Sequence, residues 1–156
     1  MEKILSEEKC DLLLLNDNRE WERIDRYGKY HQVFIQDVSL EQELEIFFGR
    51  KFKTKPIIKI LKFEKGDSIP TFSADYSSMT DEYYKRYINT NFIIQVYLNS
   101  NFEGGELTKV KTTFTPKTGY GIIQNKTEKC SISKVIQGTA YLLFVFILDL
   151  NPTTLL

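Results

Sequence analysis

The chain has 156 residues, with 21 Lys and Arg against 21 Asp and Glu, so its formal net charge at pH 7 is zero. A chain of this length buries enough surface to fold without disulfides or a structural metal. Its balanced charge excludes a general electrostatic attraction to nucleic acid or to an anionic membrane. We expect a single domain spanning residues 1–156.

The two cysteines, Cys10 and Cys130, are far apart and belong to no Cys-x-x-Cys or Cys/His pattern. This spacing argues against a zinc site or a disulfide framework and fits a reducing compartment. The start of the chain lacks the long apolar core of a signal peptide. The most apolar run, 141–148, is far shorter than the roughly 20 residues of a membrane span. We therefore expect a soluble cytoplasmic protein without a membrane partner.

Two helices are predicted in the N-terminal part. Ser6 can cap the first helix, whose buried side is supplied by the leucines that follow it. Ser39 and Gln42 match a capping box that would begin the second helix. The apolar residues of 40–48 fall on one helical face, and Gly49 is a typical stop after it.

After Pro56 the pattern changes to strands, in runs of β-branched and aromatic residues separated by turn residues. Helices followed by short strands predict an α+β fold, with a sandwich or barrel packed against helices. The stretch 77–87 has no clear period and is predicted to be a surface connection with a helical turn; a mobile loop over a pocket mouth is the alternative. The expected strands are 57–63, 92–98, 106–114, 119–124 and 140–148, with one more alternating run, QVFIQDV, between the helices.

The segment VYLNSNFEGGEL, residues 96–107, reads as a β-hairpin. Its apolar run ends at Leu98, a polar turn follows, and two glycines precede the next strand. Gly104 and Gly105 are expected to supply positive φ angles or a bulge, and Tyr97 to join the core.

The segment 96–107 belongs to one of four segments whose order along the chain is informative about the family. ILKFEKGDSIPTFSADY, FIIQVYLNSNFEGGEL, TPKTGYGII and VIQGTAYLLFVFI follow one another along the chain. Over residues 4–148 this order resembles the Fe(II)- and 2-oxoglutarate-dependent prolyl 4-hydroxylase-like oxygenases. That family has an HxD pair, a strand ending YLN-x-x-F-x-GGE-L, a P-x-x-G turn and a second His before V-x-x-G-T-R/K-Y. The resemblance implies a double-stranded β-helix, or jelly-roll barrel, with N-terminal helices packed on it.

In the family, two His and one carboxylate hold Fe(II). The HxD positions fall here on Phe72 and Ala74 or, with a one-residue insertion, on Ser73 and Asp75. The first His is missing in either register, and Asp75 is a candidate ligand only in the second.

The second His position falls on Cys130 or Ser131, and the cation that would pair with 2-oxoglutarate falls on Ala140. The only histidine, His31, lies upstream of every barrel strand and is expected to be exposed or at a strand edge. The resemblance thus implies vestigial positions, and we expect no catalytic residue, no metal and no cofactor.

A chain that has the framework motifs of this family but lacks its metal- and 2-oxoglutarate-binding residues is predicted to be a pseudoenzyme. The leading hypothesis is a non-catalytic, protein-binding or interfering module, like other degenerate members of this fold, some of them proteins of large DNA viruses. The expected partner is another protein, and a nucleic-acid partner is not expected.

Two alternatives remain open at this point. One is a Fe(II)/2-oxoglutarate-dependent hydroxylase with an unusual metal centre made from Asp75, Cys130 and either Ser73 or a tyrosine. The other is a jelly-roll that binds a small molecule or a nucleotide without chemistry, through aromatic residues such as Phe72 and Tyr76. Those same aromatic residues would otherwise pack the loop against the barrel.

Overall fold

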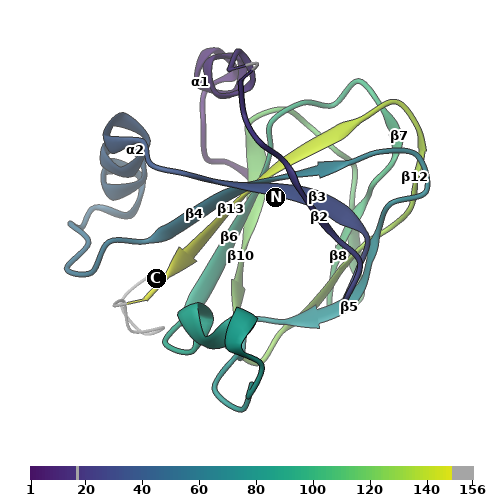
Figure 1. The fold of residues 1–156 in the computed structure, drawn as a ribbon. Helices are drawn as coiled ribbons and strands as arrows, with labels where there is room; N and C mark the ends of the chain where they lie inside the picture. Colours follow the sequence, from purple (N-terminus) through teal and green to yellow (C-terminus); the bar gives the residue numbers. More distant parts are fainter. Residues whose placement is uncertain (17, 149–156) are drawn as a thin grey trace.

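The larger of two facing sheets has seven strands in the order β1-β10-β6-β13-β4-β3-β2, each antiparallel to its neighbours (Figure 1). It is seen in a computed structural model of the chain that describes residues 1–16 and 18–148. The predicted apolar runs form its long central strands. The strands are β1 (Glu2–Lys3), β2 (Glu22–Ile24), β3 (Tyr30–Ile35), β4 (Ile57–Phe63), β6 (Phe92–Tyr97), β10 (Tyr120–Asn125) and β13 (Ala140–Ile147).

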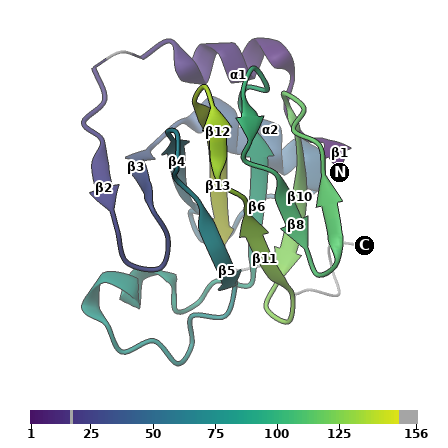
Figure 2. The same ribbon diagram turned by 90° about the vertical axis from the view of Figure 1, so that its right-hand side faces the viewer.

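A smaller sheet of order β5-β11-β8-β9 lies in front of the larger one, beside the separate pair β12-β7 (Figure 2). Its strands are short, and most of them were not predicted from the sequence. They are β5 (Ile69–Ser73), β7 (Glu103–Gly104), β8 (Leu107–Lys109), β9 (Thr112–Phe114), β11 (Lys129–Ile132) and β12 (Val135–Gln137).

The larger sheet is buried on both faces, as strand β4 illustrates. Ile58 and Ile60 belong to an outer apolar cluster, and Leu61 and Phe63 belong to an inner cluster between the sheets. Because successive side chains of a strand point to opposite faces, Lys59 shares the inner face with Leu61 and Phe63. The inner face surrounds the interior in which the fold would hold a site.

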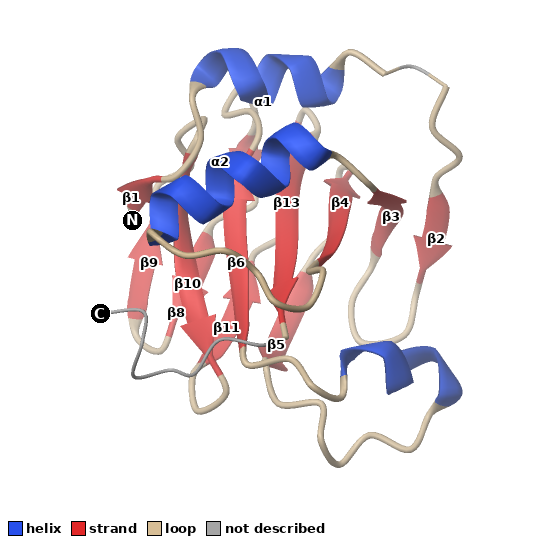
Figure 3. Ribbon diagram, turned by 90° about the vertical axis from the view of Figure 1, so that its left-hand side faces the viewer, coloured by secondary structure: helices blue, strands red, loops and turns tan. Residues whose placement is uncertain are grey.

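Two helices cover the outer face of the larger sheet, α1 (Glu7–Leu14) and α2 (Val38–Phe48) (Figure 3). Ser6 caps α1 as predicted, since its hydroxyl accepts a hydrogen bond from the Lys9 amide. The predicted cap of α2 at Ser39 is wrong: Asp37 is the cap and accepts from the Leu40 amide at 2.9 Å. The Ser39 hydroxyl instead accepts a 2.7 Å hydrogen bond from the buried Lys9 ammonium, which explains the shift.

The predicted hairpin at 96–107 is also wrong, although its residue details are correct. β6 pairs with β10 and β13, and β7 pairs with β12, so the segment crosses between sheets instead of turning back. Gly104 and Gly105 have φ of 77° and 61°, and Tyr97 is fully buried. A β-carbon on Gly104 would lie 2.1 Å from the Lys134 carbonyl oxygen, so this crossing requires a glycine.

One further expected strand, 106–114, is a hairpin of β8 and β9 that turns at Val110. This residue has φ of 60°, a value that a β-branched side chain rarely adopts. No glycine or proline marks the turn in the sequence, so the pattern alone gave no reason to break the strand.

The stretch 77–87 carries the predicted helical turn, a 3-10 helix η1 (Glu82–Tyr87) at one end of the space between the sheets (Figure 1). Tyr84 and Tyr87 are buried there, which fits the expectation that the aromatic residues pack this segment down. Among the described residues, no helix combines the length and apolarity that crossing a membrane requires.

Candidate functional site

The positions matched to the two family histidines are brought together. Phe72 on β5 and Cys130 on β11 are directly opposite each other in the smaller sheet. The Phe72 ring lies 6.0 Å from the ring of Phe144, which belongs to the larger sheet. The side chain at the first histidine position therefore bridges the two sheets as a packing residue.

Of the other matched positions, Ser73 and Asp75 line a cavity together with Phe72, whereas Ala74 and Ala140 do not. Asp75 is exposed, and its carboxylate accepts hydrogen bonds from the amide and the hydroxyl of Ser77. These hydrogen bonds lower the pKa of Asp75. Ala74 and Ala140 are fully buried in the core, and the Ser73 hydroxyl donates to the Lys126 carbonyl at 3.4 Å.

Cys130 lies next to a buried pair of amides. Gln95 donates to the Gln124 side-chain oxygen at 2.8 Å, and Gln124 donates in turn to the backbone carbonyls of Phe72 and Glu128. Burial raises the pKa of the Cys130 thiol to about 12. Burial thus disfavours the thiolate form, which a nucleophile requires.

These residues do not fit an Fe(II) and 2-oxoglutarate centre. In one register the HxD positions hold the phenyl ring of Phe72 and the methyl group of Ala74, and in the other they hold the hydroxyl of Ser73 and the solvent-facing carboxylate of Asp75. The second His position holds the buried thiol of Cys130. No group of three His, Cys, Asp or Glu side chains that could hold a metal occurs in 1–16 and 18–148. Ala140 has no charge to pair with a carboxylate. Because the donors are wrong in kind, no step of oxygenase chemistry can be derived from them.

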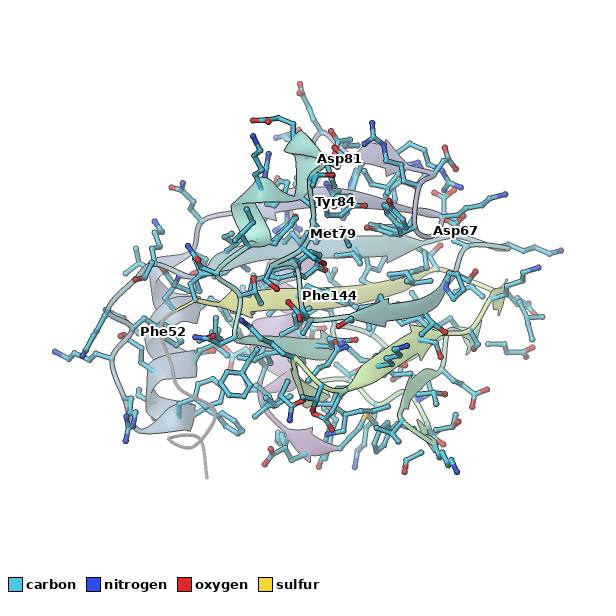
Figure 4. The ribbon with its side chains drawn as sticks, turned by 90° about the horizontal axis from the view of Figure 1, so that it is seen from below. Phe52, Asp67, Met79, Asp81, Tyr84 and Phe144 are labelled. Atoms are coloured by element: carbon cyan, nitrogen blue, oxygen red, sulfur yellow. The ribbon has the colours of Figure 1, made fainter. Side chains whose placement is uncertain are left out.

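A cavity of about 160 Å³ lies between the sheets, and one residue of η1, Tyr84, contributes to its wall. In Figure 4, which views the protein from below, Phe144 lies on β13, and Met79 and Tyr84 lie to one side of it, over the neighbouring strands; all three residues line the cavity. Its wall is mainly aromatic, with rings contributed by β3, β5, β13 and the segment around η1. The lining rings include Tyr30, Phe72, Tyr76, Tyr84, Phe144 and Phe146.

Lys59, on β4, is the one ammonium group in this wall. Its side chain is 4% exposed, and its Nζ donates to the Gln32 side-chain oxygen at 2.8 Å and to the Tyr87 hydroxyl at 3.3 Å. The Nζ lies 5.1 to 5.8 Å from the ring centroids of Tyr87, Phe146 and Tyr30. Within the described part of the chain, Lys59 forms no ion pair.

Burial lowers the pKa of Lys59 to about 7, with a smaller contribution in the same direction from Arg86 and an opposing one from Glu22. Glu22 is connected to Lys59 through Gln32, because the Glu22 carboxylate accepts a hydrogen bond from the Gln32 side-chain amide at 2.8 Å. Burial also raises the pKa values of Tyr30 and Tyr87 far above neutrality. The amine is thus the group of this cluster that changes charge near pH 7.

Sequence reasoning missed Lys59, although a signal was present. In IIKILKF the two lysines are three residues apart, so they must point to opposite faces of the strand. Lys62 lies on the outer face, with its Nζ 4.6 Å from the ring centroid of Trp21. The expectation for His31 was wrong too: it is half-buried within the sheet, between Arg23 and Lys62 of the adjacent strands.

No protein-family model and no curated protein matches this sequence. Solved structures do match. A prolyl-4-hydroxylase from Pseudomonas putida aligns with a TM-score of 0.70 at 12% identity, over 97% of this chain and 91% of its own. The viral collagen prolyl hydroxylase of Paramecium bursaria Chlorella virus-1 aligns with a TM-score of 0.65 at 14% identity, over 97% and 94%.

A cupin 2 conserved barrel protein from Rhodopseudomonas palustris also aligns, with a TM-score of 0.55 at 5% identity, over 86% of this chain and 75% of its own. The fold is a double-stranded β-helix. The double-stranded β-helix predicted from the order of the four segments is therefore confirmed, together with the two helices packed on it. At these identities the likeness is one of fold, and the site must be judged on its own residues.

Proposed function

We propose that this protein is a non-catalytic domain on the oxygenase fold, and that it acts by binding another protein. The observation that carries the proposal is the contact across the former metal position, where the Phe72 ring packs on Phe144 opposite the buried thiol of Cys130. Packing residues occupy the place in which ligands would be needed. A barrel kept in this form provides a rigid scaffold for recognition.

An open sheet edge is the surface that best supports protein binding. β2 pairs only with residues 30–32 of β3, and no described residue pairs with the outer side of 33–35. Unpaired backbone groups at such an edge are a template for an added strand. Phe34 and Val38 expose 38% and 64% of their surface beside it.

The charge around this edge indicates the kind of partner. Lys55 and Arg86 are exposed, line a groove of about 580 Å³ together with Phe34, and form no ion pair within the described residues. We therefore infer an extended segment that carries acidic residues and pairs with 33–35 as an additional strand. A domain that holds such a segment would interfere with the partner's other contacts.

The absence of catalysis can be tested first. The protein is purified anaerobically with Fe(II), its iron content is measured, and its thermal stability is followed during titration with 2-oxoglutarate. We expect sub-stoichiometric iron and no shift. Stoichiometric iron together with 2-oxoglutarate turnover would refute the proposal and favour the unusual metal centre.

The partner is tested by quantitative affinity purification with matched variants. We expect the wild type and Lys111→Glu, a substitution at an exposed residue between β8 and β9, to retain the same stoichiometric protein. The double variant Lys55→Glu/Arg86→Glu should lose it. Recovery of no stoichiometric partner by the wild type would contradict protein binding. Equal recovery by the double variant would exclude the β3 edge.

A further inference from the structure

Lys59 is a buried cation without a counter-charge. A charged lysine in a protein interior is costly unless a carboxylate or several hydrogen bonds compensate for it. Here the compensation comes from one amide oxygen, one phenol and the faces of surrounding rings. Keeping the amine charged in this setting costs stability, although the amine satisfies the buried side-chain oxygen of Gln32.

The hydrogen bonds of the Lys59 amine are incomplete. An ammonium group has three donors, and Gln32 and Tyr87 accept from it within the described residues. The third donor has no described protein acceptor. Two of the rings around the Nζ, those of Tyr30 and Phe146, line the cavity, and so does Lys59 itself. An acceptor on a molecule in the cavity would complete the set.

The size and character of the cavity restrict that molecule. A volume of about 160 Å³ is close to that of an engineered apolar cavity, about 150 Å³, that binds benzene. The wall is largely aromatic, and its polar side chains besides Lys59 are Thr71, Ser73, Asp75 and the tyrosines, which carry hydroxyl groups. Of these, the Asp75 carboxylate is exposed and engaged by Ser77, so it does not compete for the buried amine.

From this juxtaposition we propose that the cavity binds a small organic monoanion, with an apolar body of about the size of a benzene ring and a single carboxylate that pairs with the Lys59 ammonium. Such a ligand matches the wall in both respects, since its ring is buried among aromatic side chains and its carboxylate supplies the missing counter-charge. The cavity includes Phe72, Ser73 and Asp75, which match the family's HxD positions, but its cation is Lys59 on β4, whereas the family's cationic position is Ala140 on β13.

The pairing has a consequence for protons. Lys59 is only partly protonated near neutral pH, so binding a carboxylate draws a proton onto the amine. The other groups facing the amine are Tyr30 and Tyr87, whose pKa values are raised far above neutrality, and the charged residues Arg86 and Glu22. Affinity for the carboxylate should therefore fall as pH rises above about 7.

Benzoate is a suitable probe, with benzyl alcohol as its uncharged counterpart. Calorimetric titration of the full chain at pH 7 should give saturable one-to-one binding of benzoate, with proton uptake seen as a dependence on buffer ionisation enthalpy. Raising the pH to 9 should weaken benzoate binding by about tenfold or more and leave benzyl alcohol binding unchanged.

Two variants complete the test. Lys59→Met should lower the affinity for benzoate at least about tenfold while retaining that for benzyl alcohol, which also reports that the cavity is intact. Lys62→Met, on the same strand but the outer face, should behave as the wild type. The proposal is overturned if benzoate does not bind the wild type, or if its affinity is the same in Lys59→Met or at pH 9.

Discussion

The two faces of the seven-stranded sheet belong to the same strands but carry different types of side chain. The outer face, under α1 and α2, buries mostly aliphatic residues such as Ile60 and Leu143. The inner face buries aromatic rings together with polar side chains, among them Lys59 and Gln95. The outer face supports the fold, whereas the inner face keeps costly groups that packing alone does not require. Buried groups with strongly shifted pKa values cluster at functional sites.

Removing bulk from the outer face should have the largest effect. Leu143 is fully buried there, so Leu143→Ala should lower the free energy of unfolding by about 3 kcal/mol, through lost burial and the cavity left behind. Urea denaturation measures this. Ile136→Ala, at a residue that is 62% exposed, is the control and should change stability by less than about 0.5 kcal/mol. A loss below about 1 kcal/mol at Leu143 would mean that this face is loosely packed.

On the inner face, a substitution should instead stabilise the protein. The pKa of Lys59 is lowered to about 7 from 10.5, so the unfolded chain binds the proton more strongly. The penalty is complete below about pH 7, decreases as pH rises from there, and is gone above about pH 10.5. Lys59→Met should therefore add roughly 2 kcal/mol at pH 6, after allowance for its two lost hydrogen bonds. At pH 10.5, where only those lost hydrogen bonds count, it should lower stability by roughly 2 kcal/mol.

The matching measurement is chemical denaturation of both proteins across this pH range. A constant difference at all pH values would contradict a buried ammonium. Destabilisation at pH 6 would mean that the amine is well compensated by its present neighbours, and the contrast between the two faces would then disappear.

Substitutions that weaken the attachment of the helices to the outer face should lower stability by less than Leu143→Ala does. Asp37 caps α2 and also pairs with the buried Lys9 ammonium at 3.2 Å. Asp37→Ala should cost about 1 to 2 kcal/mol, because it removes a cap and leaves the Lys9 ammonium with the Ser39 hydroxyl but without its ion-pair partner. Asp25→Ala, which breaks an exposed pair with Arg23, should cost about 0 to 0.5 kcal/mol. Thermal unfolding of the two variants distinguishes them.

The reactivity of the two cysteines allows local opening of the two faces to be compared with little change in stability. Cys10 lies under α1 in the outer cluster and Cys130 in the inner one, and burial raises their pKa values to about 11 and about 12. In single-cysteine variants both thiols should react slowly with a thiol reagent at pH 8. Cys10 should react faster, because a helix of two turns opens locally more readily than the barrel. The reverse order would place the weaker packing inside.

The sequence predicted the elements that depend on local chemistry. The central strands at 57–63 and 140–147 are long, apolar runs, and Ser6 and Gly49 mark helix ends by their own side-chain or backbone properties. The short strands β5 and β11 were missed because Pro70 and the polar residues around Cys130 weaken their pattern, and sheet pairing stabilises them instead.

The candidate site was predicted less well than the fold. The motif match offered Phe72 or Ser73 and Cys130 or Ser131 as the histidine positions, by resemblance and not from a physical pattern; in the structure Phe72 and Cys130 lie opposite each other. The open edge at 33–35 and the inward direction of Lys59 depend on which strands pair and on which face becomes the interior. Which strands pair cannot be predicted from this sequence alone, because the paired strands lie far apart along the chain.

The position of β13 in the larger sheet has a consequence for how the protein forms. This strand joins β4 to β6, and its pairing of Ala140 with Phe63 links residues separated by more than half the described chain. During synthesis β4 and β6 emerge first and must wait, with apolar edges uncovered, until β13 leaves the ribosome. Nascent chains of this protein should therefore be slow to fold and depend on chaperones that shield strand edges.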